Sequence, residues 1–77
     1  MKIVKITWRD AMVRLGDQTA EELADTVTPI YQTLGFRLED SKEGDVVLAG
    51  ERNSLGQFRQ VTLIPGGMVI DTEILSG

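Results

Sequence analysis

The sequence predicts an α+β fold: a strongly bent five-stranded antiparallel sheet, or a small open barrel, with one helix between the first and second strands. Three observations predict it. Five segments carry the alternating or β-branched side chains that are typical of strands. A helix-capping sequence separates the first of these segments from the other four. Gly35 and Pro65-Gly66 mark points where the strands of a small barrel bend.

The length of the chain, 77 residues, predicts a single small domain over residues 1–77, with no room for a second core. A domain of this size buries only about 60% of the surface that its unfolded chain exposes. The sequence contains no cysteine, so no disulfide can add stability. Because small domains without such crosslinks often gain stability by association, we expect a homo-oligomer.

The first strand is predicted over residues 2–8. Val4, Ile6 and Trp8 recur at every second position, so they lie on one face of an extended chain. Lys5 lies on the opposite face, which is suited to solvent. We therefore expect the apolar face of this strand to line the core.

The only helix is predicted to begin at Thr19. Thr19 and Glu22 form a capping box, in which the Thr19 side chain accepts from the Glu22 amide and the Glu22 side chain reaches back. Pro29 lacks the amide that a helix interior needs, so the helix should end after two to three turns. We expect it to cover one end of the sheet with an apolar face made of Leu23, Val27 and Ile30.

Four more strands are predicted at residues 33–40, 45–50, 57–64 and 68–75. A polar turn follows the first of them, and a loop over residues 51–56 follows the second. The second face of residues 45–50 is also partly apolar, because it carries Val47 and Ala49. The side chains that share one face in each strand are, in order, Leu34, Phe36 and Leu38; Val46 and Leu48; Val61 and Leu63; and Met68, Ile70, Thr72 and Ile74.

The connection at Pro65-Gly66 predicts a tight corner between the last two strands. Pro65 sets the dihedral angle of the first corner position, and Gly66 permits the positive φ of a type II turn at the second. Strands joined so abruptly change direction, as at the corner of a small barrel. The arrangement that we expect is therefore SH3/Sm-like.

The charge balance excludes some classes of partner. Twelve acidic and eight basic residues give a net charge of −4, which disfavours nucleic acid because such binding needs a basic surface. No apolar run approaches the roughly 20 residues of a membrane span. The apolar stretch at the start is too short for a signal peptide, so we expect the cytoplasm as the location.

The residue types present argue against an enzyme. Histidine and cysteine are both absent, which removes the usual bases, nucleophiles and zinc ligands. Glu21, Glu22 and Asp25 cluster on the predicted helix, but acidic residues near a helix start already have a structural role. We predict no catalytic residue, no metal site and no cofactor.

Two groups of residues are candidates for ligand binding. The first is Trp8-Arg9, which offers a ring for stacking and a guanidinium for an anion. The second contains Arg52 and Asn53 of the loop, with Arg37 and Arg59 on neighbouring strands. The structural alternative is that Trp8 fills the core and that the strand arginines pair at the surface with Glu39 or Glu51.

Several short segments of the sequence resemble those of small, mostly uncharacterised accessory proteins from tailed bacteriophages and prophages. These segments are residues 4–10, 34–39, 46–50, 64–70 and 74–75. The resemblance thus covers most of the chain except the helix.

The resemblance implies a non-structural accessory protein of phage infection that works by binding in the host cytoplasm. Such proteins often counter host defence or redirect a host enzyme. The chain departs from the pattern at residues 12–15, where Met-Val-Arg-Leu stands in place of an expected aromatic residue.

Three hypotheses for the function follow. The first is a non-enzymatic phage-type accessory protein that binds a host protein stoichiometrically, through a sheet edge or face, with counter-defence as its role. The second is a sequestering protein for a small anionic nucleotide signal of bacterial immunity, with Trp8 or Phe58 stacking on the base. The third is a small nucleic-acid-binding barrel, which the acidic charge disfavours.

Overall fold

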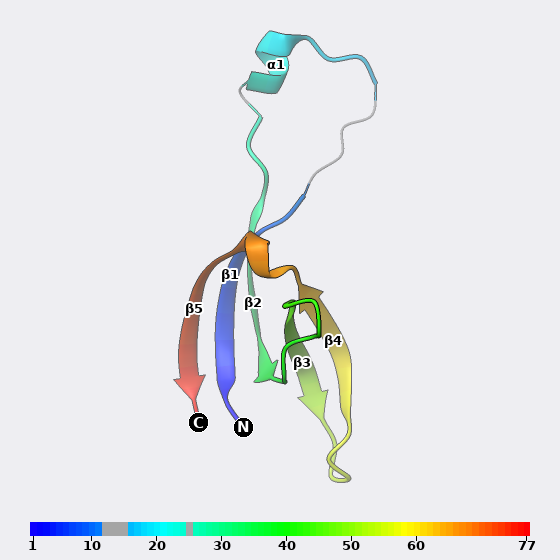
Figure 1. The fold of residues 1–77 in the computed structure, drawn as a ribbon, viewed down its shortest axis with the longest axis vertical. Coiled ribbons are helices and arrows are strands. Elements are labelled where there is room, and N and C mark those ends of the chain that lie inside the picture. The colour runs from blue at the N-terminus through cyan, green and yellow to red at the C-terminus, as the bar shows by residue number, and fades with distance from the viewer. Residues whose placement is uncertain (12–15, 25) are drawn as a thin grey trace.

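The computed structural model describes residues 1–11, 16–24 and 26–77 (Figure 1). All five strands belong to one antiparallel sheet with the order β4-β3-β2-β1-β5. This confirms the prediction of a five-stranded antiparallel sheet with one short helix. The elements are β1 (Ile3–Arg9), α1 (Ala20–Ala24), β2 (Ile30–Arg37), β3 (Val46–Arg52), β4 (Phe58–Ile64), the 3-10 helix η1 (Gly66–Met68) and β5 (Val69–Ser76).

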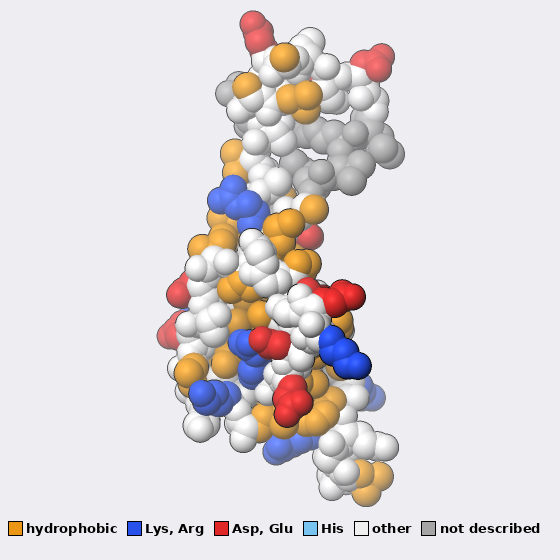
Figure 2. All heavy atoms as spheres, in the orientation of Figure 1, with side chains coloured by type: hydrophobic (Ala, Val, Ile, Leu, Met, Phe, Trp, Pro, Cys, Tyr) orange, Lys and Arg blue, Asp and Glu red, His pale blue; other side chains and the backbone are white. Residues whose placement is uncertain are grey.

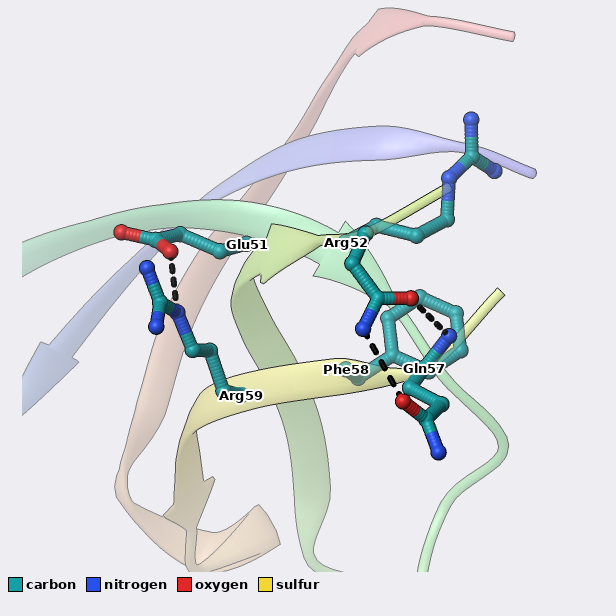
Figure 3. Close-up of a pocket in the computed structure, with 6 residues that line it drawn as sticks. Glu51, Arg52, Gln57, Phe58 and Arg59 are labelled. Atoms are coloured by element: carbon teal, nitrogen blue, oxygen red, sulfur yellow. Dashed lines mark hydrogen bonds and ion pairs between the residues drawn. The ribbon is translucent and has the colours of Figure 1, made fainter. Parts of the chain in front are cut away.

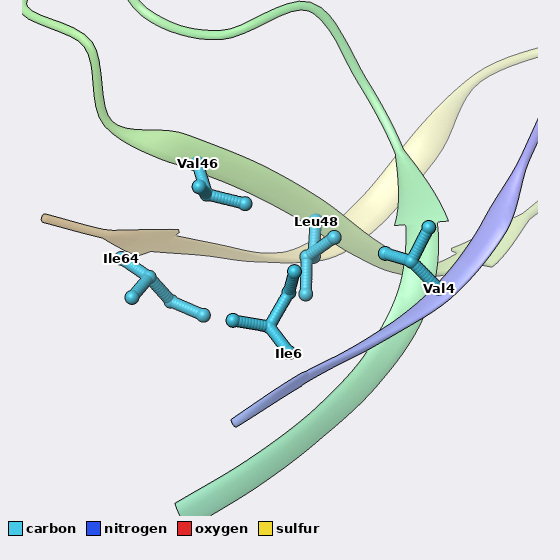
Figure 4. Close-up of a cluster of buried hydrophobic side chains, with 5 residues drawn as sticks. All are labelled: Val4, Ile6, Val46, Leu48 and Ile64. Carbon is cyan, nitrogen blue, oxygen red and sulfur yellow. The ribbon is translucent and has the colours of Figure 1, made fainter. Parts of the chain in front are cut away.

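The core lies on the concave side of the sheet and draws its side chains from three strands (Figure 4). Strand β2 lies between β1 and β3 in the sheet, so side chains of β1 can meet those of β3 and β4 only because the sheet bends over itself. Trp8 and Val69 pack against this cluster from its border. The members of the core are Val4, Ile6, Val46, Leu48 and Ile64, none of which is more than 7% exposed.

Four of these core residues were predicted from alternation along the strands. Val4 and Ile6 face inward from β1, as Val46 and Leu48 do from β3, which confirms their predicted side of the sheet. Ile64 ends β4 and was not singled out, because the prediction for that strand concerned Val61 and Leu63.

Gly35 lies where the backbone of β2 passes close to β3. A Cβ atom at this position would lie 2.7 Å from the carbonyl oxygen of Ala49 and 3.3 Å from the Cβ of Leu48. Only glycine leaves room for β3 to cross at this distance. The residue that was predicted to mark a bend therefore permits the close strand crossing that encloses the core.

The apolar residues of β2 lie mainly on the face away from the core. Thr33 and Gly35 are opposite Ile6 and Val4, so they face inward, while Leu34 is opposite Lys5 and is 57% exposed. Alternation correctly grouped Leu34 and Phe36, but β2 is Ile30–Arg37 and not the predicted 33–40, so Leu38 lies beyond it. Pairing with β1 decides which group of side chains meets the core.

In β4, too, the apolar residues that alternation groups together lie on the outer face. Val61 and Leu63 share a face, as predicted, and that face is the outer one, with 46% and 55% of each residue exposed. They are paired with Ala49 and Val47 of β3. Ala49 itself is fully buried, so the second face of β3 contributes less apolar surface than the sequence predicts.

Helix α1 is shorter than predicted and does not cover the sheet. One half of its capping box is confirmed, because the Glu22 amide donates to Thr19 Oγ1 at 3.2 Å, while the hydrogen bonds of the described residues include none from the Thr19 amide to the Glu22 side chain. The residues from Thr26 to Pro29 are not helical, however, and Ile30 begins β2. The predicted apolar face is therefore wrong: Leu23 and Val27 are 48% and 72% exposed, and α1 contains no buried residue.

Figure 1 shows the reason for this exposure. Helix α1 lies beyond one end of the sheet on two connecting segments, and the molecule is 52 Å long but only 22 Å wide. The Asp10 amide donates to the carbonyl of Pro29 at 3.0 Å and joins the two segments where they leave the sheet. Asp25 and residues 12–15, which figured in the sequence predictions, lie outside the described residues.

The connection between β4 and β5 is a turn of 3-10 helix, so the predicted type II turn is wrong. The Met68 amide donates to the carbonyl of Pro65 at 2.9 Å, and Gly66 has no positive φ. Gly66 is needed for a different reason, since a Cβ atom there would lie 2.7 Å from the carbonyl oxygen of Gly44. Met68 belongs to this turn, and β5 begins one residue later.

Among the residues that the structure describes, no helix has the length and apolar character needed to cross a membrane.

Candidate functional site

The hairpin formed by β3 and β4 carries an open hollow of about 570 Å³ at the end of the sheet farthest from α1 (Figure 3). All of its walls come from this one hairpin. Its lining is mainly polar, with a single aromatic ring. The lining residues are Glu51, Arg52, Asn53, Gln57, Phe58 and Arg59.

Asn53 shapes the tip of this hairpin. Its Oδ1 accepts from the amides of Leu55 and Gln57 at 3.0 and 2.9 Å, and its Nδ2 donates to Gln57 Oε1 at 3.0 Å. Gly56 supplies the positive φ, 78°, that closes the loop. Since these bonds use both polar groups of its side chain, Asn53 has a structural role in the hairpin.

Arg59 and Glu51 form an ion pair across the hairpin. They are directly opposite each other in the register of β3 and β4, and Arg59 Nε donates to Glu51 Oε2. The Arg59 side chain is 77% exposed, so water screens this pair and its contribution to stability is small. Figure 3 shows the two side chains pointing toward each other on one side of the hollow.

Arg52 is directed away from that ion pair (Figure 3). Its guanidinium lies 5.1 Å from the ring centre of Phe36, a cation–π distance, and the rings of Phe36 and Phe58 are 6.4 Å apart. None of the ion pairs found among the described residues includes Arg52. The positive charge of Arg52 is therefore held on an aromatic surface without a carboxylate in the described part of the chain.

Arg37 is committed to a local ion pair. Its Nη2 lies 2.7 Å from Asp40 Oδ1, three residues further along the chain. The sequence suggests Glu39 and Glu51 as partners for the strand arginines. The structure bears this out for Glu51 with Arg59, while Arg37 uses Asp40 in place of Glu39.

Trp8 lies in a different part of the sheet. Its Nε1 donates to Thr33 Oγ1 at 2.9 Å, and its ring is 5.4 Å from that of Tyr31, which is opposite it on β2. Trp8 also packs against the border of the core. These contacts are those of the structural alternative, in which the tryptophan completes a small core.

The structure brings only part of the predicted ligand group together. Arg52, Asn53 and Arg59 share the hairpin hollow. Trp8 is five residues along β1 from Ile3, the residue opposite Phe36, and this spacing corresponds to about 17 Å. Arg9 follows Trp8 and is exposed, opposite Ile30. The Trp8-Arg9 group and the hairpin group are thus two separate places.

Sequence reasoning did not place Phe36 or Gln57 in the site. The sequence pattern predicts only a strand face for Phe36, and its proximity to Arg52 depends on how β2 meets β3, where only Phe36 and Arg37 have assigned partners. Gln57 could have been found, because an asparagine followed four residues later by a side-chain amide is suited to closing a hairpin loop. For Phe58 the sequence predicts only a stacking role.

The chemistry available at the hollow is that of binding. An arginine and an aromatic ring can together hold a planar or anionic group. The residues that the structure describes contain no group of three or more acidic, histidine or cysteine side chains placed to hold a metal ion.

A second exposed feature is the outer face of the sheet, opposite the core. Figure 2 shows apolar side chains on the visible surface of the sheet region, between acidic and basic side chains. Ile30 of β2 is 52% exposed on the outer face. Three further large apolar residues are about half exposed there: Leu34 on β2, and Val61 and Leu63 on β4. We call these three residues the outer apolar strip.

Comparisons with protein-family models, with curated proteins and with solved structures return no match for this chain.

Proposed function

We propose that this chain is a non-enzymatic binding protein of the phage accessory type, which acts by stoichiometric binding to a host protein in the host cytoplasm and counters host defence. The observation that carries the binding proposal is the outer apolar strip, with Leu34, Val61 and Leu63 at 57%, 46% and 55% exposure. Val61 and Leu63 are neighbours on one face of β4, and Leu34 lies on the same face of the sheet two strands away, so together they offer exposed apolar surface that a partner could cover. The phage context comes from the resemblance of the sequence.

The apolar character of the strip and the net charge of the chain indicate what kind of contact surface the partner has. The strip lies on the outer, convex face of the sheet, which suits a flat or concave apolar surface. The net charge of −4 favours a partner whose contact surface has a basic rim. We therefore infer a host protein with an apolar patch bordered by lysine or arginine.

The same proposal includes a finer description of the fold as a small open SH3/Sm-like barrel. Two features support it. The chain runs through neighbouring strands from β1 to β4, and β5 then returns to pair with β1. The connection that makes this return has four residues, 65–68, and includes the 3-10 turn at Gly66–Met68. No hydrogen-bonded pairing joins β4 to β5 in the described part of the chain, so this barrel is open.

Capture followed by reconstitution tests the function. The immobilised chain is exposed to lysate from phage-infected host cells, captured proteins are identified by mass spectrometry, and the candidate is purified and titrated by calorimetry. We expect saturable binding with a defined stoichiometry. Leu63→Lys should weaken it at least tenfold, which corresponds to about 1.4 kcal/mol.

The matched control is Leu55→Lys, which makes the same change at the hairpin tip, where Leu55 is 81% exposed. This variant should bind as the original chain does. Equal weakening by both variants, or no saturable binding to any purified candidate, would contradict the proposal.

A second candidate function is sequestration of a small anionic nucleotide at the hairpin hollow. The observation that favours it is Arg52, whose guanidinium lies over Phe36 beside the ring of Phe58. Titration with cyclic nucleotides and ADP-ribose derivatives tests it, with Arg37→Ala as the control because Arg37 is already paired with Asp40. Binding that Arg52→Ala abolishes and Arg37→Ala leaves intact would support it, and an absence of heat with every ligand would end it.

A further inference from the structure

The sheet has two open edges. Strand β4 is paired only with β3, and β5 is paired only with β1, in the part of the chain that the structure describes. The two strands have seven and eight residues. Each therefore presents a row of backbone amide and carbonyl groups on the side that faces no strand.

Within the described part of the chain, neither edge is covered by another element, although β4 has a positive φ of 56° at Gln60 and the register of β5 with β1 shifts in two places. Natural edge strands are often interrupted by proline, guarded by lysine or covered by a helix. Strands β4 and β5 contain no proline and no lysine. Helix α1 lies beyond the end of the sheet and covers neither edge (Figure 1). Both edges are thus available for another strand.

The charges of the two edges are complementary. Strand β4 contains one basic residue, Arg59, which is paired with Glu51 but whose side chain is 77% exposed, and no acidic residue. Strand β5 contains Asp71 and Glu73 and no basic residue; Glu73 lies 2.9 Å from Lys5 of β1, whereas Asp71 is in none of the ion pairs of the described residues. Asp71 and Glu73 are opposite Thr7 and Lys5 of β1, so they project from the outer face. Arg59 shares the outer face with the β4 part of the outer apolar strip. A β4 edge beside a β5 edge would bring unlike charges together on one face.

Charge also argues against pairing of β5 with a second β5. About a two-fold axis, the acidic pair Asp71 and Glu73 of one copy would meet the same pair of the other, and like charges on facing strands destabilise a sheet. Pairing of β4 with β4 would leave both acidic β5 edges open. Only pairing of β4 in one copy with β5 in the next uses both edges of every copy.

The two edges do not pair with each other within one chain. Residues 65–68 hold the end of β4 near the start of β5, but no hydrogen-bonded register joins the two strands as the structure describes them. They lie at opposite borders of the sheet in Figure 1. The open edge of β4 is thus left for the β5 edge of another molecule.

We propose that copies of this chain associate head to tail, with the β4 edge of one copy paired to the β5 edge of the next, so that the sheet continues from copy to copy. Such a contact joins two different surfaces, so it does not stop at two copies: it gives a ring if the rotation closes and a filament if it does not. The inference does not depend on a host partner, and it leaves the outer face of each copy open.

The mass of the purified chain in solution, from size-exclusion chromatography with light scattering, is the first test. We expect three or more copies per particle. A monomer across the accessible concentration range, or a dimer that grows no further, overturns the proposal. Because no host protein is present, this result is independent of the capture experiment.

Charge reversal identifies the edges. Arg59→Glu on β4 and Asp71→Lys on β5 should each weaken association about tenfold or more, since each places like charges at the contact. The matched controls are Lys42→Glu and Glu43→Lys, which make charge changes of the same kind at exposed positions of the turn before β3 and should leave the mass unchanged.

Mixing the two reversed variants separates a lost contact from a misfolded chain. The acidic side chain introduced by Arg59→Glu in one copy would meet the basic side chain introduced by Asp71→Lys in the next. An equimolar mixture should therefore regain particles of three or more copies, in which native mass spectrometry finds both variants. Circular dichroism should show that each variant alone retains its sheet. Folded variants that fail to restore each other, or single variants that keep the original mass, would overturn the assignment of the edges.

Discussion

In the sheet, six apolar side chains are at most 7% exposed, whereas the described residues between β1 and β2, from Gly16 to Ala24 and from Thr26 to Pro29, include no buried side chain. Both regions contain apolar residues at regular spacing. In the sheet, the apolar residues meet residues from other strands. In the segment between β1 and β2, which we call the excursion, Leu23 and Val27 remain exposed. The difference shows that regular spacing supplies an apolar face, while a partner surface decides whether that face is buried.

The two regions should therefore respond differently to substitution. The sheet is stabilised by burial that joins strands far apart in the sequence. The excursion is stabilised by local bonds, such as the cap at Thr19 and the amide of Asp10 on the carbonyl of Pro29. Changes in the sheet should alter global stability, and changes in the excursion should alter only local opening.

The largest effect is expected in the core. Ile6 is fully buried at the centre of the cluster, and Ile6→Ala should reduce the free energy of unfolding by about 2–5 kcal/mol. Leu23→Ala in α1 should change it by less than about 0.5 kcal/mol. Urea unfolding followed by the fluorescence of Trp8, the only tryptophan, measures both. Similar losses for the two variants would show that the helix packs on something in solution.

The second effect tests the close crossing of β2 and β3. Gly35→Ala would place a Cβ atom 2.7 Å from the Ala49 carbonyl, and moving that backbone should cost about 1–3 kcal/mol. Gly67→Ala is the matched control, because a Cβ atom at Gly67 meets nothing within 4 Å. An unchanged urea midpoint for Gly35→Ala would mean that β2 and β3 lie farther apart in solution.

The third effect concerns the environment of Trp8. Thr33→Val keeps the shape of the side chain but removes the acceptor of the indole N–H, which should cost about 1–2 kcal/mol. Its tryptophan emission should shift as well. Thr72→Val on exposed β5 is the control and should change neither property. A variant with unchanged stability would favour a binding role for Trp8 over a structural one.

The smallest effect is expected at the helix cap. Thr19→Ala removes the acceptor of the Glu22 amide and should destabilise the helical turn by about 0.5–1 kcal/mol. The Leu23 amide, which donates to the Thr19 carbonyl, should then exchange its hydrogen faster, while the urea midpoint of the sheet stays the same. A fall in that midpoint would mean that the excursion and the sheet unfold together.

Much of the fold was predictable because strand patterns are local. The five strands, the inward direction of Val4, Ile6, Val46 and Leu48, and the capping bond of Thr19 all follow from spacing and residue type. The length of the helix did not follow, because whether residues 26–30 continue a helix or leave it depends on pairing between β2 and β1.

The site was predictable to a smaller extent. Arg52 and Asn53 are adjacent in the sequence, and a hairpin brings Arg59 back to them, so this part followed from chain order. The separation of Trp8 from these residues depends on strand direction and register. The contact of Arg52 with Phe36 depends on the bend of the sheet, which no local pattern encodes.

Association through the open sheet edges is the property on which the proposed assembly of this chain depends. Hydrogen exchange at low and high protein concentration tests it most directly. We expect amides in both β4 and β5 to become more protected as concentration rises, while amides of residues 16–24 exchange fast at every concentration. Unchanged exchange in β4 and β5 over a range in which the particle mass increases would contradict this assignment of the contact.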